Sequence, residues 1–327
     1  MRPVFVITVD TEGDNLWARP RTITTKNAQF LPRFQRLCES HGFKPTYLVN
    51  YEMAIDKEFQ AFGHAVLQTN FGEIGTHLHA SNSPPLAERK EWREGYVYVT
   101  DLPDVLIHEK MSFLTKLLTD IFETKPVSHR GGRWALDGRV VRELIELGYL
   151  VDCTVTPGVT WRRNDWTPQG CEPSYVGFGI HPYFSDPDDI RRPGISPLLE
   201  VPMTIRPNYR PLFQRIYDSI AKKSELTSRA ISKLTGEPYM WFRMNYGHRA
   251  GHSLEDLKDL VDWALTENLP VVQFMIHSSE LMPGGSPYFV DGREVEKLYS
   301  DLDNLFQHIA SKGIMGSTLA EFRHEIA

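Results

Sequence analysis

Residues 4–14 read VFVITVDTEGD, a run of strand-forming residues followed at once by three carboxylates in five positions. Valine, isoleucine, phenylalanine and threonine fit a pleated, packed surface, and a run without polar alternation predicts a strand buried on both faces. Such strands belong to parallel sheets that helices cover. The stretch therefore predicts an α/β fold whose first strand ends in Asp10, Glu12 and Asp14.

Similar short runs recur along the chain and alternate with helical patterns. The further runs are Pro45–Val49, Glu73–His77, Pro126–Arg130, Tyr149–Cys153, Leu198–Met203, Met240–Met244, Val271–Ile276 and Gly313–Ser317. Strands that alternate with helices predict parallel β/α units. About eight such units in 327 residues favour a distorted (β/α) barrel formed by a single domain over residues 1–327. An open doubly wound sheet is the alternative, although no glycine-rich phosphate loop follows the first run.

The intervening helices are indicated by period and by caps. Apolar residues step by three and four from Ile107 to Ile121 and again from Val295 to Ile309. Asp137 is placed as the N-cap of a helix that ends before Gly148, and Ser253 opens another with Asp256 three residues later. Residues 155–197 break this pattern with seven prolines and with Trp161 and Trp166, which predicts a long ordered loop or lid over one end of the barrel.

The bulk composition excludes several classes of protein. The net charge of −6 and the absence of a basic run argue against a nucleic-acid partner. No stretch approaches the roughly 18 apolar residues of a membrane span. The apolar N-terminal run is too short for a signal-peptide core, and three scattered cysteines indicate a reducing compartment. We therefore expect a cytoplasmic protein without a membrane span.

Polar residues cluster at the carboxyl ends of the predicted strands, the face that carries the active site in α/β barrels. Each has an ordinary explanation on its own, such as a solvated turn, a core histidine or a salt bridge. His77 and His79, two apart on an extended strand, point to the same side and could share a metal ion. The occurrence of these polar residues together at one end of successive strands favours a functional site. The other members are Asp10, Glu12, Arg130, Asp152 and His277.

This set resembles the polysaccharide deacetylases with a NodB-homology domain, carbohydrate esterase family 4, whose motifs occur here in the family's order. The resemblance runs from about residue 3 to residue 320. It implies a barrel that often has seven strands. His77-Leu78-His79 and the stretch from His277 to Tyr288 resemble the branch found in lipopolysaccharide and O-antigen biosynthesis, although the family's usual second histidine position is occupied by Ser81.

The resemblance also implies the roles of the residues. Asp10 would be the catalytic base, and Arg130 would hold it. Glu12, His77 and His79 would bind a divalent metal, with Asp14 as a less favoured substitute for Glu12. His277 would be the general acid and Asp152 would tune it, while Trp134 would line the substrate groove. The oxyanion donor would be a backbone N–H near Thr11 or after His79. Zn²⁺ is the first expectation for the metal, and Co²⁺, Ni²⁺ or Fe²⁺ suit the same ligands.

The expected activity is hydrolysis of an N-acetyl or other acyl group from an amino sugar. The expected substrate is nucleotide-linked or lipid-linked, or a growing O-antigen unit. A glycosidase that uses Asp10 and Glu280 as its acid pair is one alternative. A carbohydrate-binding protein that has lost catalysis is another.

Overall fold

The computed structural model describes residues 2–14, 16, 22–86, 97–161, 173–221, 227, 230–231, 234, 238–244 and 253–326. Its main sheet joins strands from both ends of the chain in the order β10-β1-β2-β3-β4-β5-β7-β6, with β11 paired to β1. These strands are β1 Val4–Thr11, β2 Pro45–Val49, β3 Glu73–Leu78, β4 Ser128–Gly131, β5 Val151–Asp152, β6 Tyr183–Phe184, β7 Leu199–Glu200, β10 Val271–His277 and β11 Met315–Gly316.

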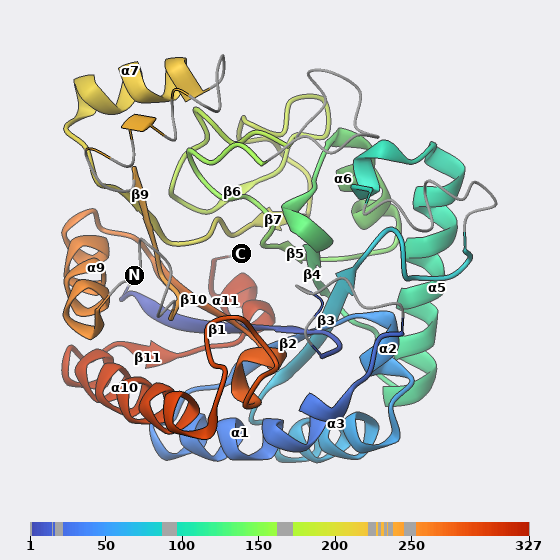
Figure 1. The fold of residues 1–327 in the computed structure, drawn as a ribbon. Helices are drawn as coiled ribbons and strands as arrows, with labels where there is room; N and C mark the ends of the chain where they lie inside the picture. The colour runs from blue at the N-terminus through green and yellow to red at the C-terminus, as the bar shows by residue number, and fades with distance from the viewer. Residues whose placement is uncertain are drawn as a thin grey trace.

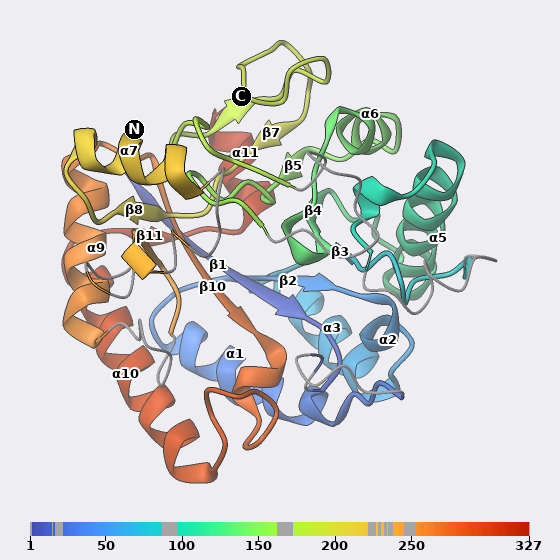
Figure 2. The same cartoon turned by 45° about the horizontal axis from the view of Figure 1, so that its top comes forward.

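The sheet from β10 to β7 contains seven strands that are all parallel to their neighbours. It curls into the distorted (β/α) barrel that the sequence predicts (Figures 1 and 2). β6 adds an antiparallel edge to β7. Among the described residues no strand pair joins β7 to β10. Instead the Gln273 N–H donates to Thr204 Oγ1 over 2.8 Å, and the Met275 N–H donates to Phe242 O over 3.2 Å.

One predicted barrel strand lies elsewhere. The run Met240–Met244 forms β9, Tyr239–Trp241, which pairs antiparallel with β8, Ile205–Pro207, in a separate two-stranded sheet. Two strands, β6 and β8, were not predicted. They are two and three residues long, too short to show a period. The predicted loop 155–197 includes β6, and residues 162–172, with Trp166 and Cys171, lie outside the described part of the chain.

Helices surround the sheet (Figure 1). The predicted helices around Ile107, Asp137, Ser253 and Val295 are confirmed as α5, α6, α9 and α10. Asp137 caps α6 and Ser253 caps α9 as expected, and Asp256 completes a capping box with Ser253.

The helices are α1 Leu31–Ser40, α2 Tyr51–Ala54, α3 Lys57–Thr69, α5 Asp104–Phe122, α6 Gly138–Glu146, α7 Pro211–Ala221, α9 Leu254–Thr266, α10 Gly292–Ser311 and α11 Leu319–Ile326. Short 3-10 turns are η2 Lys26–Phe30, η3 Val99–Asp101, η4 Gly132–Trp134 and η5 Ser278–Leu281. No helix in the described part combines the length and apolar character that crossing a bilayer requires.

Alternate residues of β1 contribute to two different hydrophobic clusters. Phe5, Ile7 and Val9 join the large cluster between the sheet and its outer helices. Val4 and Val6 join a smaller cluster with Leu319 and Phe322 of α11. Since alternate residues of a strand share a face, Thr8 and Asp10 continue the second row. The side chain of Asp10 is therefore directed to the inner face of the barrel at the carboxyl end of β1.

Candidate active site

The register of the sheet brings the predicted residues together. Asp10, near the end of β1, pairs with His277 at the end of β10. His77, near the end of β3, pairs with Arg130 of β4. Because the strands are parallel, all four residues lie at the same edge of the barrel.

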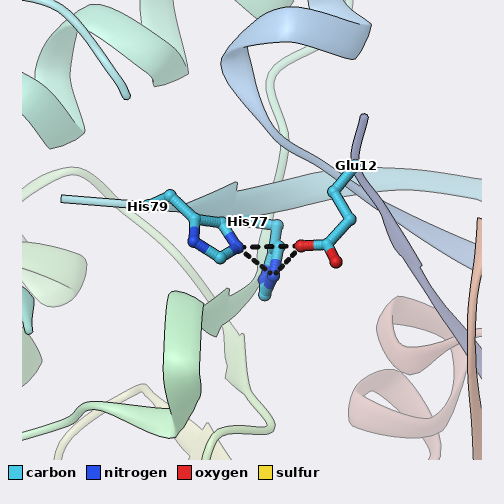
Figure 3. Close-up of side chains that lie close together, drawn as sticks. All are labelled: Glu12, His77 and His79. Carbon is cyan, nitrogen blue, oxygen red and sulfur yellow. Dashed lines mark hydrogen bonds and ion pairs between the residues drawn. The ribbon is translucent and has the colours of Figure 1, made fainter. Parts of the chain in front are cut away.

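Glu12, His77 and His79 converge on one point (Figure 3). Glu12 Oε2 lies 2.9 Å from His79 Nε2 and 3.5 Å from His77 Nε2. The two Nε2 atoms are 3.1 Å apart. Among the described residues, the donor atoms of these three side chains all lie within 4.8 Å of one another. Two imidazoles and one carboxylate form a donor set typical of a catalytic zinc site, which keeps a further position open.

The tautomer of His77 also suits a metal ligand. Its Nδ1 lies 3.0 Å from Arg130 O, and a carbonyl oxygen only accepts, so Nδ1 carries the hydrogen. Nε2 is then the nitrogen that faces the Glu12 carboxylate and offers a lone pair for a metal ion. Two acceptors face each other favourably only with a proton or a metal ion between them. A backbone carbonyl behind the ring is the usual support of a metal-binding histidine.

Electrostatic interactions favour the protonation states in which Glu12 and His79 can bind a metal ion. Burial raises the pKa of Glu12, but the interactions with the facing rings of His77 and His79 outweigh it and hold that pKa well below its usual range. Burial lowers the pKa of His79, and the facing Glu12 offsets this only in part. An ionised glutamate and a neutral imidazole are the states that bind a cation.

The structure distinguishes Glu12 from Asp14. Both oxygens of Asp14 accept hydrogen bonds within the following loop, from the hydroxyl of Thr24 and from the backbone N–H groups of Lys26 and Asn27. Asp14 thus organises the chain after β1, whereas Glu12 faces the histidines.

Asp10 is buried and ion-paired. Its Oδ1 accepts a hydrogen bond from Arg130 Nη1 over 2.5 Å. Its Oδ2 lies 3.8 Å from His277 Nε2 and 4.0 Å from His77 Nε2. Burial raises the pKa of Asp10, yet the Arg130 guanidinium and the two histidines outweigh it, so the pKa lies below its ordinary value. Asp10 is therefore ionised, with one oxygen held by arginine and the other directed to the space between the histidines.

The carboxylate beside His277 is not Asp152, as the sequence resemblance predicted, but another residue. Asp152 accepts a hydrogen bond from His129 Nδ1 over 2.7 Å, because β5 pairs with β4 and not with β10. The carboxylate beside His277 is Glu280, whose Oε2 lies 3.5 Å from Nδ1. Burial lowers the pKa of His277, but Glu280, together with the charges of Glu12 and Asp10, outweighs it and the pKa is raised.

Close packing around η4 requires glycine. A Cβ on Gly132 would lie 2.4 Å from Leu78 O and 3.0 Å from His79 Cγ, so a side chain there would displace the end of β3. Trp134 follows and is only 7% exposed. Its ring stacks on Trp161 at 5.9 Å and meets Trp241 edge to face at 5.7 Å. Trp134 thus belongs to a packed aromatic cluster next to Arg130, whose Cζ lies 4.8 Å from its ring.

Besides Glu280, two polar residues of this region were not assigned a role in the deacetylase prediction. Ser278 Oγ accepts from the Glu12 N–H over 3.0 Å and from Asn27 Nδ2, and so holds the backbone of Glu12. Glu52 follows β2 at the same edge, and burial together with the charge of Glu12 raises its pKa to about 7. Ser278 adjoins His277 in the sequence, but nothing local distinguishes Glu52 from a first-turn helix glutamate.

Comparison with known proteins supports the fold. No model of a known family matches the chain, and no curated protein matches its sequence. Among solved structures, a proposed glycoside hydrolase/deacetylase from Parabacteroides distasonis aligns with a TM-score of 0.61 at 10% identity, over 99% of this chain and 70% of that one. A proposed polysaccharide deacetylase from Mycobacterium smegmatis has a TM-score of 0.48 at 12% identity, over 98% and 97% of the two chains. A 4-alpha-glucanotransferase from Thermococcus litoralis has a TM-score of 0.49 at 11% identity, over 98% of this chain and 38% of that one. At 10% identity, the likeness to the Parabacteroides distasonis structure shows the barrel fold alone.

Proposed function

We propose that the chain is a metal-dependent deacetylase of the carbohydrate esterase family 4 type, which hydrolyses the N-acetyl group of an amino sugar. One observation carries the proposal. A carboxylate held ionised by a buried arginine, Asp10, lies beside three imidazoles and a second carboxylate at the carboxyl edge of the barrel. Amide hydrolysis needs a base for water, a stabilised oxyanion and an acid for the leaving amine, and this arrangement contains candidates for the base and the acid.

Asp10 and His277 divide the proton transfers between them. Asp10 Oδ2 takes a proton from water as the water oxygen bonds to the acyl carbon. The carbon–nitrogen bond then breaks, and His277 Nε2 delivers its proton to the departing amine. The products are acetate and the free amino sugar, and proton exchange between Asp10 and His277 through solvent restores the starting state. Arg130 keeps Asp10 ionised and directs its Oδ2 into the site.

Glu12, His77 and His79 would hold the divalent ion. Such an ion supplies Lewis-acid chemistry, which polarises the acyl carbonyl and acidifies water. Zn²⁺ is the first ion to test, and Co²⁺, Ni²⁺ and Fe²⁺ accept the same nitrogen and oxygen donors.

The proposed substrate class rests on the sequence. The stretches around His79 and Glu280 resemble deacetylases of lipopolysaccharide and O-antigen biosynthesis, which favours an acetylated sugar linked to a nucleotide or a lipid carrier. Trp134 is proposed to border the sugar site, because its aromatic cluster adjoins Arg130.

The test is acetate release from a panel of N-acetylated sugars by protein loaded with Zn²⁺ or Co²⁺. The panel contains free, nucleotide-linked, lipid-linked and polymeric N-acetyl amino sugars. Asp10→Asn and His277→Asn are expected to lower kcat by about 10²–10⁴. His108→Asn is the matched control, since the side chain of His108, on α5, is 59% exposed and pairs with Glu143 of α6. Turnover by Asp10→Asn at the wild-type rate would exclude the proposed base. Activity on chitin alone would overturn the linked-sugar class.

The glycosidase alternative requires Asp10 and Glu280 as its two carboxyl groups. Glu280 is fully buried and lies between Arg243 and His277, so it does not face a substrate. The binding-protein alternative predicts sugar binding without turnover, and the same acetate assay decides it.

A further inference from the structure

The carboxylate of Glu280 is fully buried directly behind His277. Glu280 belongs to η5, the turn that follows β10, and its Oε2 accepts the backbone N–H of His277 over 2.8 Å. The same oxygen lies 3.5 Å from Nδ1 of the His277 ring. One oxygen thus contacts both the backbone and the side chain of a single residue.

The other ring nitrogen of His277 faces the site. Its Nε2 lies 3.8 Å from Asp10 Oδ2 and 4.0 Å from Glu12 Oε1. A carboxylate beside Nδ1 favours the ring form in which Nδ1 carries hydrogen while Nε2, pointing away from the carboxylate, carries the proton for the departing amine. The geometry corresponds to the way a buried aspartate orients the histidine of a serine hydrolase.

A partly buried arginine holds Glu280 from the far side. Arg243 follows β9, and its Nη2 donates to Glu280 Oε1 over 2.7 Å. The side chain of Arg243 is 13% exposed. Glu280 therefore uses one oxygen for Arg243 and the other for His277. A lone buried carboxylate would be costly, and the two cationic partners on opposite sides offset that cost.

We propose that Glu280, held by Arg243, is the positioning residue for His277 in the deacetylation reaction. The inference rests on the proposed function and assigns to Glu280 the part that the sequence resemblance assigned to Asp152. Glu280 does not touch the substrate. It acts by fixing the ring of His277 so that Nε2 faces the departing nitrogen.

The first test compares two substrates with different leaving groups in the variant Glu280→Gln, which keeps the size of the side chain. An N-acetyl amino sugar needs protonation of its nitrogen, whereas p-nitrophenyl acetate releases a phenolate that leaves without it. We expect Glu280→Gln to lower kcat on the amide by about 10²–10⁴ with KM unchanged, and to keep most of the ester rate. Arg243→Met is expected to lower the amide rate in the same direction, and Arg243→Lys to restore part of it.

Glu143→Gln is the matched control, because Glu143 is also a buried glutamate, 2.8 Å from the Nδ1 of His108. It is expected to keep wild-type rates on both substrates. Wild-type amide turnover by Glu280→Gln would overturn the inference. An equal loss on amide and ester would also overturn it, since that pattern reflects general damage to the site.

The second test does not depend on activity. Long-range ¹H–¹⁵N spectra of the histidine rings report which nitrogen of His277 carries hydrogen, and His277→Asn identifies its signals. We expect hydrogen on Nδ1 in the wild type and an altered protonation pattern in Glu280→Gln, with the signals of His77 and His129 unchanged. An unchanged His277 signal in Glu280→Gln would refute the positioning role even if no acetylated sugar is turned over. An altered signal without any turnover would leave Glu280 as the orienting group and remove the proposed reaction.

Discussion

Removal of Arg130 tests whether the buried ion pair with Asp10 organises the barrel interior. Arg130 is fully buried and Asp10 is 2% exposed. Besides Asp10, Arg130 donates to Thr8 Oγ1 over 2.8 Å and to Cys153 O over 3.2 Å. Arg130→Met keeps much of the volume but leaves the Asp10 carboxylate without its main partner. Breaking one side of a buried pair costs about 3–5 kcal/mol, so we expect a loss of that size in the free energy of unfolding.

The measurement is urea unfolding followed by tryptophan fluorescence, with a chelator present so that bound metal does not contribute. The double variant Asp10→Asn/Arg130→Met completes a cycle, and we expect it to be no less stable than Arg130→Met, because no unpaired charge remains. Arg33→Met is the control, since Arg33 and Glu296 pair at 42% and 67% side-chain exposure, where solvent screens the attraction between the two charges. A loss below about 1 kcal/mol for Arg130→Met, or strictly additive losses in the cycle, would refute the reasoning.

Three further predictions concern metal, pH and packing. His79→Ala and Glu12→Gln should each abolish stoichiometric zinc in metal analysis of the purified protein. Asp14→Asn should retain zinc, because Asp14 only caps the following loop. Equal zinc in all three variants would contradict the ligand assignment. Glu52 has a folded pKa raised from 4.5 to about 7, so its protonated form stabilises the folded state below pH 4.5 and this contribution is lost as the pH rises through about 7. Metal-free wild type should therefore lose stability relative to Glu52→Gln over that window, and parallel pH curves would count against the burial of this carboxyl group. Phe5→Ala should lower the free energy of unfolding by about 3–5 kcal/mol, because the Phe5 ring packs between Phe43 at 4.9 Å and Phe306 at 5.8 Å; a loss below about 1 kcal/mol would show that this aromatic core repacks.

Much of the architecture was predictable because local signals and tertiary structure agree. The apolar run from Val4 to Val9 is a strand because such residues are stable only when both faces are covered, and β1 lies between β10 and β2. Asp137 and Ser253 mark helix starts because their side chains accept backbone N–H groups two or three residues later. The run at Met240 was assigned to the wrong sheet, since an apolar run indicates a strand but not its partner.

The sequence by itself determined which residue types follow each strand, and parallel strands bring such residues to one edge. It therefore predicted the convergence of Asp10, Glu12, His77 and His79 before any distance was known. Only the tertiary structure decided which partner each of the nearby carboxylates contacts. Glu12 faces the histidines while Asp14 caps a loop, and Glu280, not Asp152, lies behind His277. The physical reason is that a pattern gives the strand and the face of a side chain, whereas its partner depends on which strands are neighbours and on the path of the intervening chain.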